Sequence, residues 1–366
     1  MQVEVAVIGG GINGLAIAHK LASLYGATVA VFDDGRLGAA SRAAAGFLGA
    51  QTEGAALPAS VRSEIFPLLR QSRLLHEFLD SHLHESVGLG SGYRCTGALH
   101  VARDERELEA LVSRYGWQRE QGAQVVVLSA REARALEPSL SPSIAGAVYL
   151  PDEAAIDPGG LLSALRRACD ELGVLSISER ARQLVCEGGR VSGVLTDGGV
   201  YAVDAVVVAA GGWLSGLGGM PHALAPVQPR PARTVLLGGG AGRLGHVVLS
   251  GQGYIVPWVD GSLALGSTAD AGDASEDMLQ GLYAAASSVP ELASRPIRHI
   301  CVGYRPHAPG GLPWVGRVGA EGLFVATGNV RNGMLLAPLA ASLVGDLVGG
   351  RTRDGGPFAP PAACRP

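Results

Sequence analysis

The sequence is poor in charge and almost without lysine. Charged residues make up 17% of the 366 positions and hydrophobic residues 47%, and Lys20 is the one lysine among 29 basic residues. The formal net charge is −4, and no cluster of basic residues occurs along the chain. These absences argue against nucleic acid or an anionic membrane surface as a partner, and the high apolar content argues against long disordered segments.

Long apolar runs and paired cysteines are also missing. No run is long enough to cross a bilayer, and the apolar start, VEVAVIGGG, is broken by glycines and lacks the basic region of a signal peptide. No two of the five cysteines form a C-x-x-C pair, and no histidines have metal-ligand spacing. We therefore expect a cytoplasmic protein with free thiols and without a metal site.

What the sequence does contain is a dinucleotide-binding fingerprint near its start. Gly9, Gly11 and Gly14 match G-x-G-x-x-G between a short apolar strand and a helical pattern, and a second strand ends at Asp33. The glycines permit a tight turn, a close approach of backbone to a pyrophosphate, and packing of the helix on the strand. Asp33 can accept a hydrogen bond from a ribose hydroxyl and would repel a 2′-phosphate, which disfavours NADP. The motif alone does not separate FAD from NAD.

A second match to the fingerprint, at Gly240, Gly242 and Gly245, has the wrong surroundings. The residues after it, HVVLSG and GYIVPWVDGSLALGS, alternate like strands, and no helix follows to bind a phosphate. We interpret this match as a loop between antiparallel strands, so a second bound nucleotide is not expected.

Segments typical of a nucleotide-binding fold recur in the middle and at the end of the chain. Asp157 and Pro158 stand where an N-cap and a first helical residue would open a helix, and VVVAAGGW indicates another buried strand that runs into glycines. Between these segments the span 216–300 alternates like antiparallel strands and holds one helical stretch at 276–288. We expect an α/β protein in which two domains are interleaved along the chain.

Eight segments, in order along the chain, resemble the FAD-dependent D-amino-acid oxidase superfamily. They are VIGGGINGLAIAHKLA, SRAAAGFLGAQ, GYRCTGALHVA, DPGGLLSALRRA, VVVAAGGW, GYIVPWVDGSLALGST, GYRPHAPGGLPWVGR and GLFVATGNVRNGMLLAP. Within the superfamily the chain is most similar to the glycine oxidases of thiamine biosynthesis. The resemblance implies non-covalently bound FAD, a Rossmann-type FAD-binding domain, and a substrate-binding domain whose antiparallel sheet covers the flavin.

The resemblance also divides the chain and assigns the cofactor site. The FAD-binding domain would comprise residues 1–80, 145–215 and 300–366, and the substrate-binding domain residues 81–144 and 216–299. The residues implied to contact FAD are Gly9, Gly11, Ile12, Asn13, Gly14, Asp33, Asp34, Ser41, Arg42, Ala45, Gly46, Phe47, Arg182, Asn329, Val330, Arg331, Asn332, Gly333, Met334 and Leu335.

Three residues are implied to bind the substrate. Arg305 would bind its carboxylate with two parallel hydrogen bonds, Tyr254 would donate another, and Arg331 would lie beside the amine. By the resemblance, the amine is oxidised to an imine, FAD takes up the hydride, and O₂ reoxidises the flavin to give H₂O₂. Such a reaction depends on orientation, which agrees with the absence of a Ser/His/Asp or paired-carboxylate motif.

Three positions depart from the glycine oxidase pattern. Phe47 replaces a methionine at the flavin edge, Gln51 replaces a histidine, and Ala269 stands where a bulkier residue is common. We therefore expect glycine, sarcosine or a short D-amino acid as substrate, not glycine alone. Cys301 is close to the position where sarcosine oxidases attach FAD, but it is one residue out of register, so we expect a buried thiol there.

The expected partners are a small amino acid or amine and O₂ as electron acceptor. Two alternatives stay open: a dehydrogenase of the same fold that passes electrons to a quinone or carrier, and a flavin-binding protein without amine chemistry. A larger amine of secondary metabolism is an alternative substrate to one serving the thiazole of thiamine. Whether the chain forms a homo-oligomer is also open.

Overall fold

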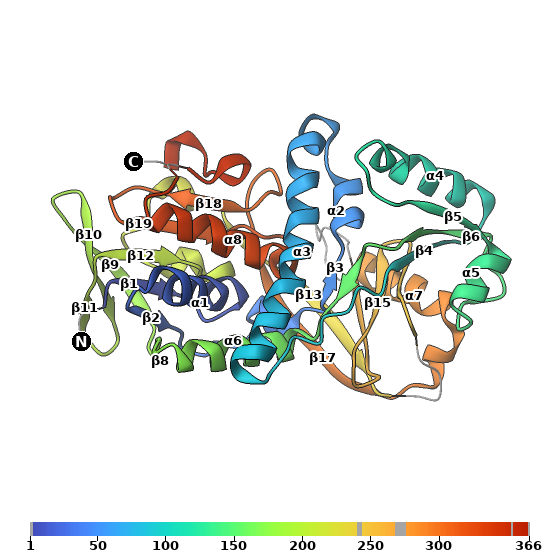
Figure 1. The fold of residues 1–366 in the computed structure, drawn as a ribbon, viewed down its shortest axis with the longest axis horizontal. Coiled ribbons are helices and arrows are strands. Elements are labelled where there is room, and N and C mark those ends of the chain that lie inside the picture. Colours follow the sequence, from blue (N-terminus) through green and yellow to red (C-terminus); the bar gives the residue numbers. More distant parts are fainter. Residues whose placement is uncertain (1–2, 240–243, 268–275, 353, 365–366) are drawn as a thin grey trace.

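The computed structural model describes the chain except for residues 1–2, 240–243, 268–275, 353 and 365–366. A six-stranded sheet lies at one end of the molecule and an eight-stranded sheet at the other, with the long helix α3 (Arg62–Val87) between them (Figure 1). This is the mixed α/β, two-sheet architecture that the sequence predicts.

The six-stranded sheet has the order β18-β19-β12-β1-β2-β8. Neighbouring strands are parallel except for the edge pair β18 and β19. The strands are β1 (Val5–Ile8), β2 (Val29–Phe32), β8 (Leu175–Ile177), β12 (Ala205–Val208), β18 (Trp314–Arg317) and β19 (Leu323–Thr327).

Different elements cover the two faces of this sheet. Val5 and Val7 of β1 pack on the helices α1 (Ile12–Tyr25), α6 (Pro158–Glu171) and α8 (Gly333–Val348). The alternate residues, Ala6 and Ile8, face the small sheet of β9 (Ala181–Glu187), β10 (Arg190–Thr196) and β11 (Val200–Ala202). Burial on both faces explains why these strands are continuous apolar runs and not alternating ones.

The eight-stranded sheet has the order β17-β13-β16-β15-β14-β4-β6-β5 and is antiparallel except for the pair β14 and β4. Its strands are β4 (Ala98–Ala102), β5 (Val126–Ser129), β6 (Gly146–Leu150), β13 (Gln228–Leu237), β14 (Val247–Ser250), β15 (Gly253–Pro257), β16 (Leu263–Ser267) and β17 (Ile297–His307). The remaining elements are β3 (Phe47–Leu48), β7 (Ala154–Ala155), α2 (Ala50–Ala56), α4 (Glu105–Gly116), α5 (Ala130–Leu136) and α7 (Glu276–Ser288).

Local signals in the sequence predicted several element boundaries. Asp157 caps α6, accepting a hydrogen bond from the amide of Gly159 over 2.9 Å, and Pro158 is its first residue. Helix α7 occupies the expected positions 276–288. Of the second glycine match, Gly240 and Gly242 lie outside the described residues, and the first element after Gly245 is a strand, β14.

The division into two domains stays a proposal, and the sheets show where its limits fall. Strand β6 belongs to the eight-stranded sheet although residues 145–215 were assigned to the FAD-binding domain. Strand β17 crosses the proposed limit at residue 300 and pairs along its length with β13. Strands β13 and β17 also contact residues 40–43 and 211–216, which follow β2 and β12, and so connect the eight-stranded sheet with the six-stranded one.

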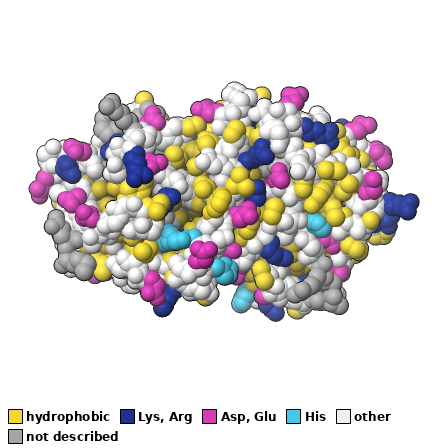
Figure 2. All heavy atoms as spheres, in the orientation of Figure 1, with side chains coloured by type: hydrophobic (Ala, Val, Ile, Leu, Met, Phe, Trp, Pro, Cys, Tyr) yellow, Lys and Arg dark blue, Asp and Glu magenta, His cyan; other side chains and the backbone are white. Residues whose placement is uncertain are grey.

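Three further observations concern membrane-spanning helices, surface charge and metal ligands. No helix in the described part of the chain combines the length and apolarity needed to cross a membrane. Acidic and basic side chains are interspersed over the face shown in Figure 2, and neither sign gathers into one large patch there. Among the described residues, no group of three His, Cys, Asp or Glu side chains could hold a metal ion.

Candidate active site

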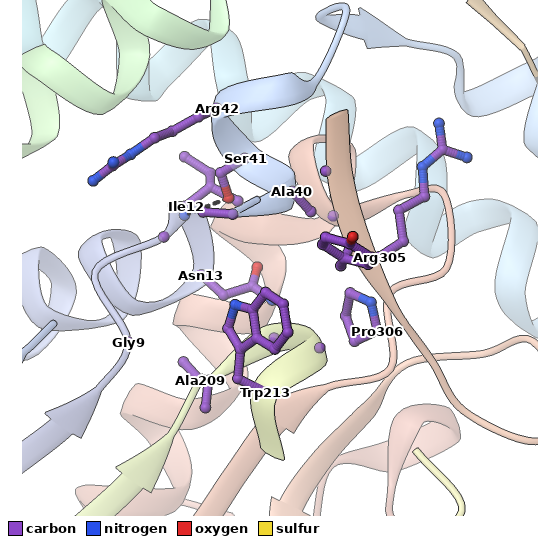
Figure 3. A pocket seen from close by; sticks show the side chains of 18 of the residues that line it. Gly9, Ile12, Asn13, Ala40, Ser41, Arg42, Ala209, Trp213, Arg305 and Pro306 are labelled. Carbon is purple, nitrogen blue, oxygen red and sulfur yellow. Dashed lines mark hydrogen bonds between the residues drawn. The ribbon is translucent and has the colours of Figure 1, made fainter. Parts of the chain in front are cut away.

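One pocket lies where the carboxyl ends of the parallel strands face the eight-stranded sheet. Its walls come from the turns after β1, β2 and β12, from residues 39–47, from β17 and from the turn before α8. In Figure 3, Gly9 and Ile12 lie on one side of this pocket, and Arg305 and Pro306 of β17 lie on the other. Open parallel sheets bind their ligands at the carboxyl ends of the strands, so the position suits a nucleotide.

Two glycines in the turn between β1 and α1 have no room for a side chain. Gly9 has a φ of 110°, and a Cβ there would lie 2.4 Å from the carbonyl oxygen of Ala209. A Cβ on Gly14 would lie 1.8 Å from the carbonyl oxygen of Gly9, so this residue permits the close packing of α1 but does not line the pocket. The amide of Ile12 donates to Ser41 Oγ over 3.0 Å (Figure 3). The turn has the backbone form of a phosphate-binding helix start.

The end of β2 places two carboxylates in the pocket wall. Asp33 and Asp34 directly follow the last residue of the strand, and both line the pocket. Asp33 lies against the glycine turn, because a Cβ on Gly10 would lie 2.4 Å from its Oδ2. Nearby, the guanidinium carbon of Arg36 lies 4.0 Å from the ring centroid of Trp213, and both residues also line the pocket.

Arg182, which was also expected to contact the cofactor, lies outside this pocket. Arg182 pairs with Asp197 over 2.6 Å, with both side chains about half exposed, and it does not line the pocket. Residues 179–181 form the wall at this point. The backbone reaches the pocket just where β9 begins, directly before the expected position, and the contact of Arg182 with FAD stays a prediction.

Residues 39–47 form a wall of mostly small side chains, and residues of other strands and turns fix its backbone from the side away from the pocket. The Thr234 hydroxyl donates to the carbonyl oxygen of Ala43 over 2.6 Å, and the Trp258 indole donates to that of Ala45 over 2.9 Å. Gly46 has a φ of 88°, and a Cβ there would lie 2.1 Å from the carbonyl oxygen of Ile156. The segment is therefore held by Thr234 of β13, by Trp258 just after β15 and by Ile156 just after β7, and its backbone is open to a ligand on the other side.

The turn before α8 brings residues from the end of the chain to the glycine turn. Asn329, Val330, Arg331, Gly333 and Met334 line the pocket, whereas Asn332 and Leu335 do not. Asn13 Nδ2 donates to Asn329 Oδ1 over 3.0 Å. Within the described structure, the other amide atoms of this pair, Asn13 Oδ1 and Asn329 Nδ2, are buried without a hydrogen-bond partner. A bound group with both a donor and an acceptor would satisfy them.

The far end of the pocket combines a phenol with a guanidinium. Tyr254 of β15 and Arg305 of β17 both line it, and the ring centroid of Tyr254 lies 5.7 Å from that of Phe47. Burial raises the pKa of Tyr254, while the positive charge of Arg305 and a hydrogen bond with it act in the opposite direction. The phenol is therefore neutral and able to donate. Within the part of the chain that the structure describes, Arg305 forms no ion pair.

The charge of Arg331 has a carboxylate partner that the sequence did not reveal. Arg331 Nη2 lies 2.8 Å from Glu53 Oε2, and their side chains are 22% and 13% exposed. The negative charge of Glu53 also acts to raise the pKa of Tyr254. Glu53 stands on α2, 278 residues before its partner, and no local pattern distinguishes it from other acidic residues.

The positions that depart from the glycine oxidase pattern fall in different places. Phe47 lines the pocket, but Gln51 is fully buried behind it and donates to the carbonyl oxygen of Gln124 over 2.9 Å. Ala269 lies outside the described residues. Cys301 is half-buried, less than the sequence suggested, because it lies on the edge strand β17, and it does not line the pocket.

Comparisons with known proteins agree with this geometry. A model of the family described as FAD dependent oxidoreductase matches residues 4–347. The glycine oxidase of Geobacillus kaustophilus is 35% identical over 357 residues, covering 95% of this chain and 93% of that protein. The glycine oxidase of Pseudomonas putida is 32% identical over 370 residues, covering 98% of this chain and 99% of that protein.

Solved structures show the same likeness. The crystal structure of the Geobacillus kaustophilus glycine oxidase matches with a TM-score of 0.86 at 32% identity, covering 99% of both chains. That of an iminodiacetate oxidase from Chelativorans sp. matches with a TM-score of 0.85 at 26% identity, covering 98% of this chain and 99% of that chain.

Proposed function

From the premise that the chain belongs to the FAD-dependent oxidoreductase family, we propose that it oxidises glycine or a small relative, such as sarcosine or a short D-amino acid, to the imine. Bound FAD would supply the redox chemistry, taking up a hydride from the substrate Cα and passing two electrons to O₂ to give H₂O₂. Water then converts the imine to a 2-oxo acid and the amine or ammonia. The observation that carries the proposal is the position of Arg305 and Tyr254 in the same pocket as the nucleotide turn.

The residues that line the pocket suit the diphosphate, a ribose and further polar groups of FAD. The turn at Ile12, with Ser41 and Arg42 opposite, would hold the diphosphate, and Asp33 would accept from a ribose hydroxyl. The unpartnered amide atoms of Asn13 and Asn329 would bond polar groups of the cofactor. Cys301 does not line the pocket, which supports binding without a covalent link.

The substrate end favours a monocarboxylic amino acid. The planar guanidinium of Arg305 would bind the carboxylate through two hydrogen bonds, with a third from Tyr254. Arg331 is the second cation of this region, but the carboxylate of Glu53 already compensates its charge. A substrate with a second carboxylate, such as iminodiacetate, would compete with Glu53 for Arg331 and is disfavoured.

The ring of Phe47 favours small substrates. It lies beside Tyr254 in the wall of the pocket, where a bulky group narrows the space left for a substrate side chain. A difference of one methylene in such a pocket changes discrimination by only about 1–3 kcal/mol, so several small amines should react. A product for the thiazole of thiamine is the role that the glycine oxidase relatives favour, and a larger amine of secondary metabolism is the alternative.

The test is a peroxide-coupled screen of glycine, sarcosine, D-alanine, D-proline, iminodiacetate and larger cyclic amines, with the L-form where one exists. The purified protein should be yellow, should release FAD on acid precipitation, and should react fastest with small monocarboxylic substrates. A parallel assay with a dye as electron acceptor separates an oxidase from a dehydrogenase. Activity confined to L-amino acids, or to amines without a carboxylate, would contradict the proposal.

A further inference from the structure

The first turn of α8 contains a helix defect that this chain repairs from another helix. Pro338 lies inside α8, four residues after Met334. In an α-helix the amide of one residue donates to the carbonyl four residues earlier, and proline has no amide hydrogen. The carbonyl oxygen of Met334 therefore lacks its ordinary helical donor.

Helix α3 supplies a donor to that carbonyl. His76 Nε2 lies 2.8 Å from the carbonyl oxygen of Met334 and 3.2 Å from that of Leu335. One turn earlier on the same helix, the Ser72 hydroxyl donates to the carbonyl oxygen of Leu335 over 2.6 Å. Since residues four apart share one face of a helix, Ser72 and His76 bind two consecutive carbonyls from one side.

Because Ser72 and His76 are buried, the loss of their hydrogen bonds should affect the conformation of this turn. Ser72 is fully buried and His76 is 1% exposed, so bulk water does not reach the two carbonyls that they bind. Both partners of His76 Nε2 are acceptors, so the hydrogen of the neutral ring must be on Nε2. Burial lowers the pKa of His76 to about 4, which keeps the ring neutral under physiological conditions.

The repaired turn belongs to the pocket, whereas the repairing residues do not. Met334 and Gly333 line the pocket together with Asn329 and Arg331, but Ser72 and His76 contact the turn from its far side. A carbonyl without a donor in this buried turn would favour a different backbone conformation. The position of the pocket wall would change with it.

We propose that His76 is a positioning residue that fixes the pocket-lining first turn of α8 by replacing the hydrogen bond that Pro338 cannot make, while Ser72 holds the next carbonyl, that of Leu335. The inference rests on the proposed function, because the turn is assigned there to FAD. If the inference is correct, a variant with a backbone amide at position 338 tolerates the loss of His76. A general contribution of His76 to folding would not produce this rescue.

The experiment is a double-mutant cycle on apoprotein titrated with FAD, read by quenching of flavin fluorescence and by the visible flavin spectrum. His76→Ala should raise the Kd for FAD about tenfold, the factor that corresponds to about 1.4 kcal/mol. Pro338→Ala, which restores the amide, should change Kd little alone and should recover most of the loss in the double variant. His76→Gln, which keeps a side-chain amide donor, should stay closer to the wild type than His76→Ala.

Matched controls come from the same helix. Ser86 donates to the carbonyl oxygen of His82 within α3, and His84 is exposed on α3, so Ser86→Ala and His84→Ala should leave both Kd and spectrum unchanged. Ser72→Ala, the counterpart of Ser86→Ala, should weaken FAD binding. The effect of Pro338→Ala should be the same in the His84→Ala background as in the wild type.

The outcomes separate this inference from the proposed function. If the wild-type protein does not bind FAD, the proposed function itself fails. If it binds FAD and His76→Ala leaves Kd and spectrum unchanged, only the positioning role is overturned. Equal effects of His76→Ala with and without Pro338→Ala overturn it as well. Should His76→Ala fail to fold, the inference requires Pro338→Ala to restore folding, and continued failure of the double variant contradicts it.

Discussion

At the scale of single residues, Arg305 and Tyr254 are expected to contribute unequally to substrate binding. Arg305→Ala should lose most activity on amino acids and keep FAD, because the substrate carboxylate would be desolvated without a counter-charge, at a cost of roughly 2–5 kcal/mol. Tyr254→Phe should cost less, about 1.5–3 kcal/mol, since it removes one hydrogen bond to the charged carboxylate. Steady-state kcat/KM for glycine in both variants measures the two effects.

An amine without a carboxylate distinguishes a binding role of Arg305 from a general one. The wild type and Arg305→Ala should oxidise such an amine at similar, low rates, because the guanidinium has no group to bind. If the substitution slows both kinds of substrate equally, Arg305 does not recognise the carboxylate. The FAD content of each variant, taken from its absorbance, serves as the control.

Asp33 is expected to affect the cofactor and not the fold. It directly follows β2 and lies against the glycine turn, where its carboxylate would accept from the ribose of FAD. A hydrogen bond to a charged group contributes about 1.5–3 kcal/mol, so Asp33→Ala should weaken FAD binding by that amount in a titration of the apoprotein. Asp197→Ala, at an exposed ion pair outside the pocket, is the matched control. Equal Kd values for the two variants would remove Asp33 from the site.

At the scale of elements, α2 is expected to determine which substrate charge the pocket prefers, because α2 places Glu53 next to Arg331. Glu53→Gln keeps the shape of the side chain and makes this end of the pocket more positive by one charge. The ratio of kcat/KM for iminodiacetate to that for glycine should therefore rise, by about tenfold if the change is worth about 1.4 kcal/mol. Glu64→Gln, near the exposed start of α3, is a suitable control. Gln51→Glu is not, because Gln51 is fully buried behind the pocket. A constant ratio would contradict this role of α2.

Elements whose signals are local could be predicted from the sequence, and contacts between distant elements could not. The glycine turn, the cap at Asp157 and the helix α7 follow from residues within a few positions of each other. The pair of Glu53 with Arg331 spans 278 residues, and the hydrogen bond of Ser72 with Leu335 spans 263. Such contacts depend on how α2, α3 and α8 pack together. Neither periodicity nor turn chemistry specifies that packing.

The same limit applies to the cofactor contact expected near β9. The expected position, Arg182, came from similarity in a stretch without a specific motif, whereas the contacts expected in residues 9–13 and 41–47 came from distinctive motifs. In the structure the side chain of Arg182 bonds Asp197, while the pocket wall is formed by residues 179–181. Similarity in such a stretch cannot distinguish residue 181 from residue 182. The difference matters because successive residues of a strand point to opposite faces.

At the scale of the whole molecule, buried titratable groups should give the stability a maximum near pH 6.5. Burial lowers the pKa of His19 and His76 to about 4 and that of His100 to about 3, from an ordinary value of 6.5. Between pH 6.5 and 4 the unfolded chain binds protons that the folded chain does not, so stability falls as the pH falls through this range. Burial raises the pKa of Glu153 from 4.5 to about 8, with hydrogen bonds from α2 acting in the opposite direction.

Glu153 has the opposite linkage, and it determines the alkaline side of the curve. Between pH 4.5 and 8 the folded state keeps a proton that the unfolded state releases, so this group makes stability fall as the pH rises. Below pH 6.5 the three histidines outweigh it, and above pH 6.5 it is the one of these four groups that still titrates. Free energies of unfolding from urea titrations, at saturating FAD, should therefore decline between pH 6.5 and 8 in the wild type and stay nearly level in Glu153→Gln. The exposed Glu132→Gln is the control and should follow the wild type. Parallel curves for the wild type and Glu153→Gln across that range would show that the buried carboxyl does not hold its proton.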